Sequence, residues 1–167
     1  MGIVTYPDEA LRGRSSPVEN IDKEVVSLAD GMTEALFRAE GIGLAAPQVG
    51  VLKRLIVVNV EDDFHIVVNP EIVQTNEEKE SAAEGCLSIP GPEADVERPT
   101  RVEVRGYDLD GNEVKLTREG LAARVFLHEV DHLNGTLFID HLSETARSAT
   151  LKEYRNARKE ENTGAAA

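Results

Sequence analysis

The sequence contains one cysteine, Cys86, and no long apolar run. A lone cysteine cannot form an intrachain disulfide, which fits a reducing compartment. No segment approaches the roughly 18–20 apolar residues that span a bilayer. The first residues also lack the charged and apolar regions of a secretory signal. We therefore expect a cytoplasmic protein that does not enter a membrane.

Positive charge is also scarce. The chain has 18 lysines and arginines against 31 aspartates and glutamates, and its formal net charge is -13. This balance disfavours attraction to nucleic-acid backbones and anionic membranes, so we expect no direct nucleic-acid specificity. The 167 residues show no internal repeat and no Pro/Gly/Ser-rich linker. We predict a single catalytic domain over residues 1–167, with a disordered tail over about 157–167.

Apolar residues at helical spacing predict two core helices. The first follows the capping residue Asp22 and ends near Glu40, and the second runs from Gly120 to Asn134. A weaker, polar helix is expected from Ser143 to about Asn156.

The middle of the chain is rich in β-branched residues. Residues 55–58 and 66–68 are short apolar runs typical of buried strands. Residues 102–104 and 114–116 alternate with polar residues around a turn at 108–112, which predicts a hairpin with one solvent face. The predicted class is α+β: antiparallel strands packed around the second helix, with an N-terminal helix and a C-terminal helix.

The second helix contains the sequence HEVDH. His128 and His132 are four residues apart, so their side chains lie on the same helix face, where two imidazoles can bind one metal ion. Glu129 lies beside them for general acid–base work. The alternative is a pair of solvent-facing histidines. The apolar neighbours of the motif favour the metal site, because an unpaired buried Glu and His would be costly. We therefore predict that this central helix binds a metal.

A catalytic site of this kind normally has a third protein ligand. The metzincin continuation of the motif fails, because Phe138 stands where a histidine would be required and His141 comes too late. A thermolysin-type glutamate would have to be Glu153, in the weak polar helix. Cys86, in EGCLS between predicted strands, is the attractive candidate because a thiolate binds transition metals well. Its alternative is a buried small residue.

The third informative segment is GIGLAAPQ, residues 41–48. Its glycines and small residues suggest backbone that passes close to a ligand, and it ends in an amide that donates hydrogen bonds. The three segments GIGLAAPQ, EGCLS and HEVDH resemble, in order and spacing, the signature motifs of peptide deformylases. The likeness continues from Tyr6-Pro7-Asp8 to residues 137–140 and covers most of the chain.

The resemblance implies a metal-dependent hydrolase that removes the formyl group from the N-terminal methionine of newly synthesised polypeptides and releases formate. It implies that Cys86, His128 and His132 hold the metal, most often Fe²⁺, with Ni²⁺, Co²⁺ or Zn²⁺ as alternatives. The metal would make a bound water acidic, and that water would attack the formyl carbon. Glu129 would take its proton and deliver it to the leaving amine.

The resemblance also assigns the remaining parts of the site. The Gln48 side chain and the backbone N–H of Leu87 would stabilise the oxyanion. The peptide would bind as an added strand along Ile42, Gly43 and Gly85.

The sequence departs from the family at Leu127, where a glutamine is usual, and we expect an effect only on packing or hydrogen bonding behind the site. For Glu84, Arg98 and Asp131 two interpretations stay open: solvated surface, or a network that orients the metal-binding histidines. His65 and His141 are expected to be structural.

Two functional alternatives also stay open. One is an amidase acting on another formylated substrate, and the other is a metal-binding relative with impaired turnover. The C-terminal segment mixes acidic and basic residues and is not a basic arm. Transient docking on the ribosome therefore stays a hypothesis.

Overall fold

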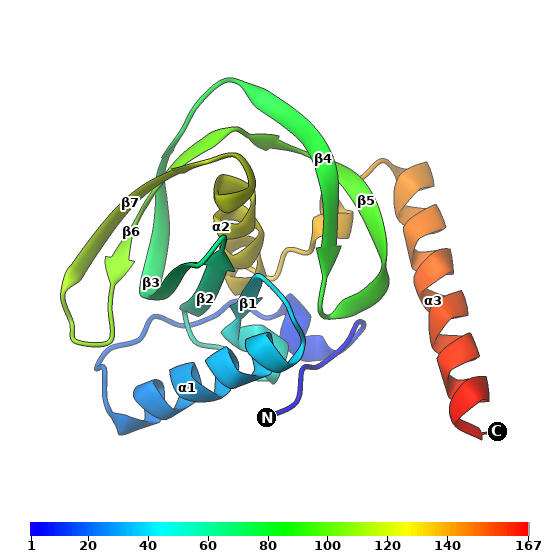
Figure 1. Cartoon of the computed structure of the whole chain (residues 1–167), viewed down its shortest axis with the longest axis horizontal. Helices are drawn as coiled ribbons and strands as arrows, with labels where there is room; N and C mark the ends of the chain where they lie inside the picture. Colours follow the sequence, from blue (N-terminus) through cyan, green and yellow to red (C-terminus); the bar gives the residue numbers. More distant parts are fainter. Residues whose placement is uncertain (167) are drawn as a thin grey trace.

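The computed structural model describes residues 1–166, and the side-chain surroundings of residues 1–161. The class is α+β, as predicted, with antiparallel strands around a central helix (Figure 1). In chain order the elements are η1 (Glu9–Arg12), α1 (Lys23–Arg38), β1 (Gly43–Ala45), η2 (Ala46–Val49), β2 (Leu55–Val60), β3 (Asp63–Thr75), β4 (Lys79–Cys86), β5 (Ile89–Pro99), β6 (Arg101–Tyr107), β7 (Glu113–Glu119), α2 (Gly120–Leu133), η3 (Phe138–His141) and α3 (Glu144–Ala166).

The larger sheet has five antiparallel strands in the order β1-β2-β3-β6-β7. Helix α2 packs on one face of this sheet and α1 on the other. Strand β2 contributes to the hydrophobic clusters on both faces of the sheet. Ile56 and Val58 pack in the cluster with α2, and Leu55 and Val57 pack in the cluster with α1. Both faces of the strand are covered, which explains why these residues are apolar without alternation.

The three predicted helices are present. The side chain of Asp22 accepts a hydrogen bond from Val25 N at 3.0 Å, so the predicted cap of α1 is confirmed. The predicted hairpin is β6–β7, and Val102 and Val104 point to the core. Strand β7 leads directly into α2, which begins at Gly120 as predicted.

Strands β4 and β5 form a separate two-stranded sheet, visible as an arch above α2 in Figure 1. The prediction that EGCLS lies between strands is wrong for Glu84, Gly85 and Cys86, which belong to β4, and holds for residues 87–88, which form the turn before β5. The β4 sequence has no β-branched or aromatic residue and β5 contains three prolines, so local preference hid both strands. The pairing of β4 with β5 and their packing beside α2 outweigh this weak local preference for a strand.

Helix α3 continues to Ala166, so its predicted end at about Asn156 is too early. The predicted disordered tail is wrong for residues 157–166, which are helical, and residue 167 lies outside the described residues. Alanine, arginine, lysine and glutamate are good helix formers and sustain the extension. Leu151 and Tyr154 anchor the helix in the cluster with β5 and η3. No helix in the described part of the chain has the length and apolar character to cross a membrane.

Candidate metal centre and active site

The structure brings the three predicted ligand residues together. Helix α2 presents His128 and His132 on one face, and Cys86 is the last residue of β4. The Sγ atom of Cys86 lies 3.4 Å from His132 Nε2, which is 3.3 Å from His128 Nε2. One ligand atom from each residue lies within 4.8 Å of the others, so the three residues could hold one metal ion.

The hydrogen bond of His128 and the burial of His132 fit this role. His128 Nδ1 donates to Glu84 Oε1 at 2.9 Å, which leaves its Nε2 atom free to bind a metal. His132 is buried, and burial lowers the pKa of its imidazole well below the ordinary value, so it stays neutral as a ligand must. A thiolate with two imidazoles suits iron, cobalt, nickel or zinc.

Negative groups surround His128. Burial lowers the pKa of this imidazole, but the charge of Glu129 and the hydrogen bonds of Cys86 and Glu84 raise it well above the ordinary value. The same negative charge that attracts a proton attracts a divalent cation to the Nε2 atom. The electrostatics of the centre therefore favour a bound cation.

Glu129 is buried, and its Oε1 atom has no hydrogen-bond partner in the described part of the chain. Burial and the charges of Glu84 and Asp131 raise its pKa to about 7, against the opposing effects of His128 and Arg98. The carboxylate lies against Gly43, where an added Cβ would collide with it. Gly43 therefore leaves the space that Glu129 occupies.

Gln48 is also at the centre. Its Oε1 atom accepts a hydrogen bond from Ala45 N at 2.9 Å, which fixes the amide orientation. Its Nε2 group donates to Cys86 Sγ at 3.6 Å and to Ser88 Oγ at 3.2 Å. The amide N–H donors of Gln48 thus face the sulfur of the proposed ligand, at the junction of η2 with the β4–β5 turn.

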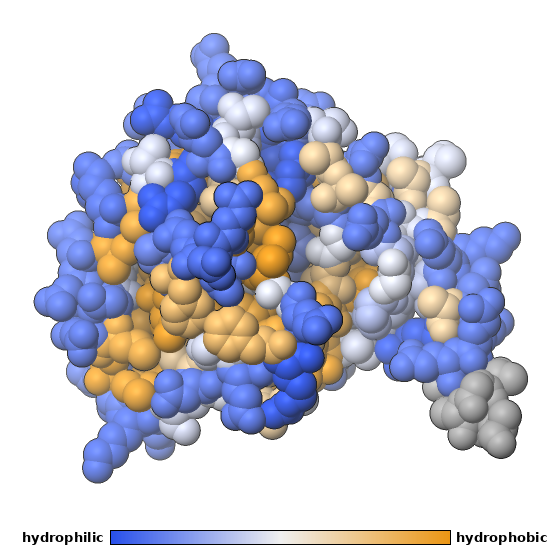
Figure 2. Space-filling view, viewed as in Figure 1, coloured by the Kyte–Doolittle hydropathy of each residue, from blue (hydrophilic) through white to orange (hydrophobic). Residues whose placement is uncertain are grey.

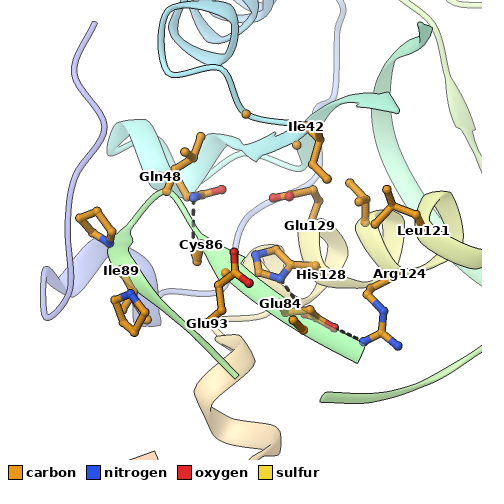
Figure 3. Close-up of a pocket in the computed structure, with 18 of the residues that line it drawn as sticks. Ile42, Gln48, Glu84, Cys86, Ile89, Glu93, Leu121, Arg124, His128 and Glu129 are labelled. Atoms are coloured by element: carbon orange, nitrogen blue, oxygen red, sulfur yellow. Dashed lines mark hydrogen bonds and ion pairs between the residues drawn. The ribbon is translucent and has the colours of Figure 1, made fainter. Parts of the chain in front are cut away.

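A cavity of about 430 Å³ opens above these groups. Its walls come from the segment before and within β1, from β4 and β5 with their turn, and from one side of α2 (Figure 3). Every residue predicted to bind substrate or oxyanion lines it: Ile42, Gly43, Gln48, Gly85 and Leu87. Cys86, His128 and Glu129 lie in the same wall, whereas His132 lies behind them.

A buried ionic network supports the centre. Arg98 holds Glu84 with two parallel hydrogen bonds of 2.9 Å, and Arg124 Nη1 donates to Glu84 Oε2 at 2.7 Å. Burial raises the pKa of Glu84, but Arg98 and His128 lower it more, so the carboxylate is ionised. Of the two open interpretations, the network holds for Glu84 and Arg98.

Asp131 extends this network at a partly exposed position. It accepts hydrogen bonds from Arg98 Nη1 at 2.7 Å and from His141 Nε2 at 2.8 Å. Among the described residues, neither His141 nor His65, which pairs with Asp63 at 2.7 Å, belongs to a group that could hold a metal ion. Leu127 packs against the hydrophobic cluster between α2 and the larger sheet, so an apolar side chain fits at this position.

Arg124 was not predicted from the sequence. Besides Glu84, it donates to the backbone carbonyls of Val96 at 2.6 Å and Glu80 at 2.8 Å, so it ties α2 to the β4–β5 hairpin. The available signal was an arginine one helical turn before His128 in an otherwise apolar segment. A charged residue buried there requires a charged partner.

A Cys/His/His centre with two buried imidazoles beside a helical glutamate, in an α+β fold with an open pocket, defines a metal-dependent hydrolase. The family model described as Polypeptide deformylase matches residues 1–148. The chain therefore belongs to the peptide deformylase family, whose members are metal-dependent enzymes.

Individual relatives agree with this assignment. Peptide deformylase 1 of Clostridium acetobutylicum is 49% identical over 140 residues, covering 84% of this chain and 93% of the relative. The peptide deformylase of Chromohalobacter salexigens is 46% identical over 154 residues, covering 90% and 91%. The crystal structure of a peptide deformylase from Legionella pneumophila matches with a TM-score of 0.92 and 38% identity, covering 96% of each chain.

Proposed function

We propose that this deformylase hydrolyses the formyl amide of peptides that begin with formyl-methionine, releasing formate and a free amine. The observation that carries the proposal is the position of the Glu129 carboxylate next to the Cys86/His128/His132 cluster in the wall of one pocket. The substrates are newly synthesised polypeptides, and we propose the cytoplasm as the place of action. Helix α3, with its mixed charges, is the candidate for a transient contact with the ribosome.

We propose Fe²⁺ as the native ion, held by Cys86, His128 and His132. A bound ion in such a site acidifies water and polarises a carbonyl oxygen. Glu84 then serves to keep the proton of His128 on Nδ1, so that Nε2 stays available for the ion.

Glu129 moves the proton. Its carboxylate accepts a proton from the attacking water and then delivers it to the nitrogen of the leaving amine. The free Oε1 atom supports this role, because it has no hydrogen bond to give up before it meets a substrate or water. Gly43 gives the carboxylate room to lie there.

Charge that builds on the formyl oxygen needs donors. We assign the Nε2 group of Gln48 and the backbone N–H of Leu87, which line the pocket on the side of Cys86. Gln48 is held by Ala45 through its other amide atom, so the donor is oriented before the substrate arrives.

The peptide has a place between the two sheets. Strand β1 is an edge of the larger sheet, and its Gly43 lines the pocket opposite Gly85 of β4. An extended peptide that bonds to these backbones adds a strand between them, with Ile42 beside its apolar side chain.

The test is formate release by protein purified without oxygen, with metal content measured on the same sample. We expect release from formyl-Met peptides and none from formyl amides that lack a peptide, together with iron near one ion per chain. Equal turnover of small formylated amides would favour the amidase alternative. Full metal occupancy without turnover of any formyl compound would favour the impaired relative.

A further inference from the structure

We propose that Glu93 gives the enzyme a preference for substrates with a lysine or arginine close behind the formyl-methionine. This inference rests on the proposed function, since it concerns the peptide that would occupy the same pocket. Glu93 lies on β5 and lines the cavity together with Gly85, Arg124 and two of the metal-centre residues, Cys86 and His128.

The position of Glu93 depends on Gly85. A Cβ placed on Gly85 would lie 3.3 Å from Glu93 Cγ and 4.0 Å from its Oε1 atom. The side chain of Glu93 therefore crosses the backbone of β4 at the residue that has no side chain. Figure 3 shows the carboxylate of Glu93 directed into the pocket, on the side where Cys86 and His128 lie. A peptide bound along Gly85 passes next to this carboxylate.

The other charged groups in the pocket wall are either paired with one another or assigned to the proton transfer. Glu84 and Arg124 pair with each other at 2.7 Å, and Glu84 also holds His128. Glu129 is buried beside the metal ligands. Among residues 1–161, by contrast, Glu93 has no hydrogen-bond or ion-pair partner. Glu93 is thus the exposed, unpaired charge in this wall, available to a side chain of the bound peptide.

A free carboxylate at the edge of a peptide groove attracts a cationic side chain and repels an acidic one. The net charge of -13 acts in the same direction over longer distances. Because Glu93 is exposed, the contribution of the ion pair is modest, on the order of a two- to fivefold change in kcat/KM. Successive side chains of an extended peptide point to opposite faces, so the second and third residues are tested separately.

The experiment measures kcat/KM for formyl-Met peptides that carry lysine, glutamine or glutamate at the second or third residue. The proteins are the wild type, Glu93→Gln, Glu93→Lys and the control Glu97→Lys. Glu97 is an exposed residue on the same strand outside the pocket, so its variant makes the same charge change without touching the groove. Each series is run at low and high ionic strength.

We expect the wild type to favour lysine over glutamate about fivefold at one of the two positions, and less at high salt. Glu93→Gln should reduce the preference and Glu93→Lys should reverse it, while Glu97→Lys keeps it. An equal lysine-to-glutamate ratio in wild type and Glu93→Gln would overturn the inference, as would a loss of the preference in Glu97→Lys. Failure of the proposed function is a separate result, because neither the wild type nor any variant would then release formate, even from the glutamine peptide.

Discussion

The Nδ1 atom of His128 lies 2.9 Å from Oε1 of Glu84, and two buried arginines hold the same carboxylate. Glu84 therefore fixes the protonated nitrogen of His128 and turns the other toward Cys86 and His132. A carboxylate in this position also increases the electron density of the imidazole ligand. The metal affinity of the centre should depend on a residue that is not itself a ligand.

We predict that Glu84→Gln weakens metal binding by about 10- to 100-fold, as is typical when the partner of a ligating histidine is changed. Competition with a chelator, followed by metal analysis, measures the affinity. The matched control is Glu80→Gln on the same strand, whose side chain is exposed. Equal metal affinity in the two variants would show that the hydrogen bond to His128 does not tune the site.

Arg124 should matter more for folding than for chemistry. Its side chain is 8% exposed and that of Glu84 is 4%, so removal of the guanidinium leaves a buried carboxylate with one arginine instead of two. We predict that Arg124→Met lowers the free energy of unfolding by about 3–5 kcal/mol, measured with urea. Arg38→Met, which breaks an exposed pair with Glu34, should cost about 1 kcal/mol or less. A similar small loss for Arg124→Met would contradict the tie between α2 and the β4–β5 hairpin.

The contrast between Arg124 and the histidines shows which parts of the site the sequence could reveal. His128 and His132 were predictable because their spacing on a helix is a local property. Cys86 was a candidate because of its chemistry alone. The partners of Arg124 lie on β4 and β5, and these strands lack the β-branched pattern by which strands are recognised. Their pairing depends on contacts between residues far apart in the chain, and so does the position of Glu93. Helix α3 was underestimated because a polar sequence of good helix formers also resembles a disordered tail.

Glu129 should be essential for turnover and dispensable for the metal. We predict that Glu129→Gln reduces kcat by about 10²–10⁴-fold, the range for loss of a general acid–base group, while metal content stays at the wild-type level. Formate release and metal analysis on one sample test both parts. Retention of more than about a tenth of the activity would remove Glu129 from the proton-transfer role, since such groups contribute at least about 100-fold.

Gly43 should be intolerant of even one methyl group. A Cβ there would collide with the Glu129 carboxylate and would lie 2.8 Å from Val125 Cγ1. We predict that Gly43→Ala displaces the carboxylate and reduces kcat/KM by more than tenfold, because misplacement by about 1 Å can cost 100-fold. The control is Gly2→Ala, where an added Cβ has no neighbour within 4 Å. A Gly43→Ala enzyme with wild-type kinetics would show that catalysis does not depend on the Glu129 carboxylate lying against residue 43.

Asp140, which lies outside the metal centre, allows a test of how the stability of the fold depends on pH. Burial raises the pKa of its carboxyl. Hydrogen bonds from Arg12 at 2.6 and 3.1 Å and from Leu137 N at 2.9 Å lower this pKa by more, so it lies below the ordinary value. A folded pKa below the unfolded value of about 3.9 adds stability above that value, and the addition is lost as the pH falls through the folded pKa.

We predict that Asp140→Asn is less stable than the wild type at pH 7. The gap in unfolding free energy should stay constant down to about pH 4 and then shrink as the wild-type carboxyl takes up a proton. Urea unfolding at pH values between 7 and 3 measures the gap. Asp95→Asn is the control, because Asp95 is exposed and makes no ion pair among residues 1–161. The sign decides the outcome: a gap that widens as the pH falls from 4 to 3 would mean that the folded pKa of Asp140 lies above the unfolded one. In that case Arg12 does not stabilise the charged form.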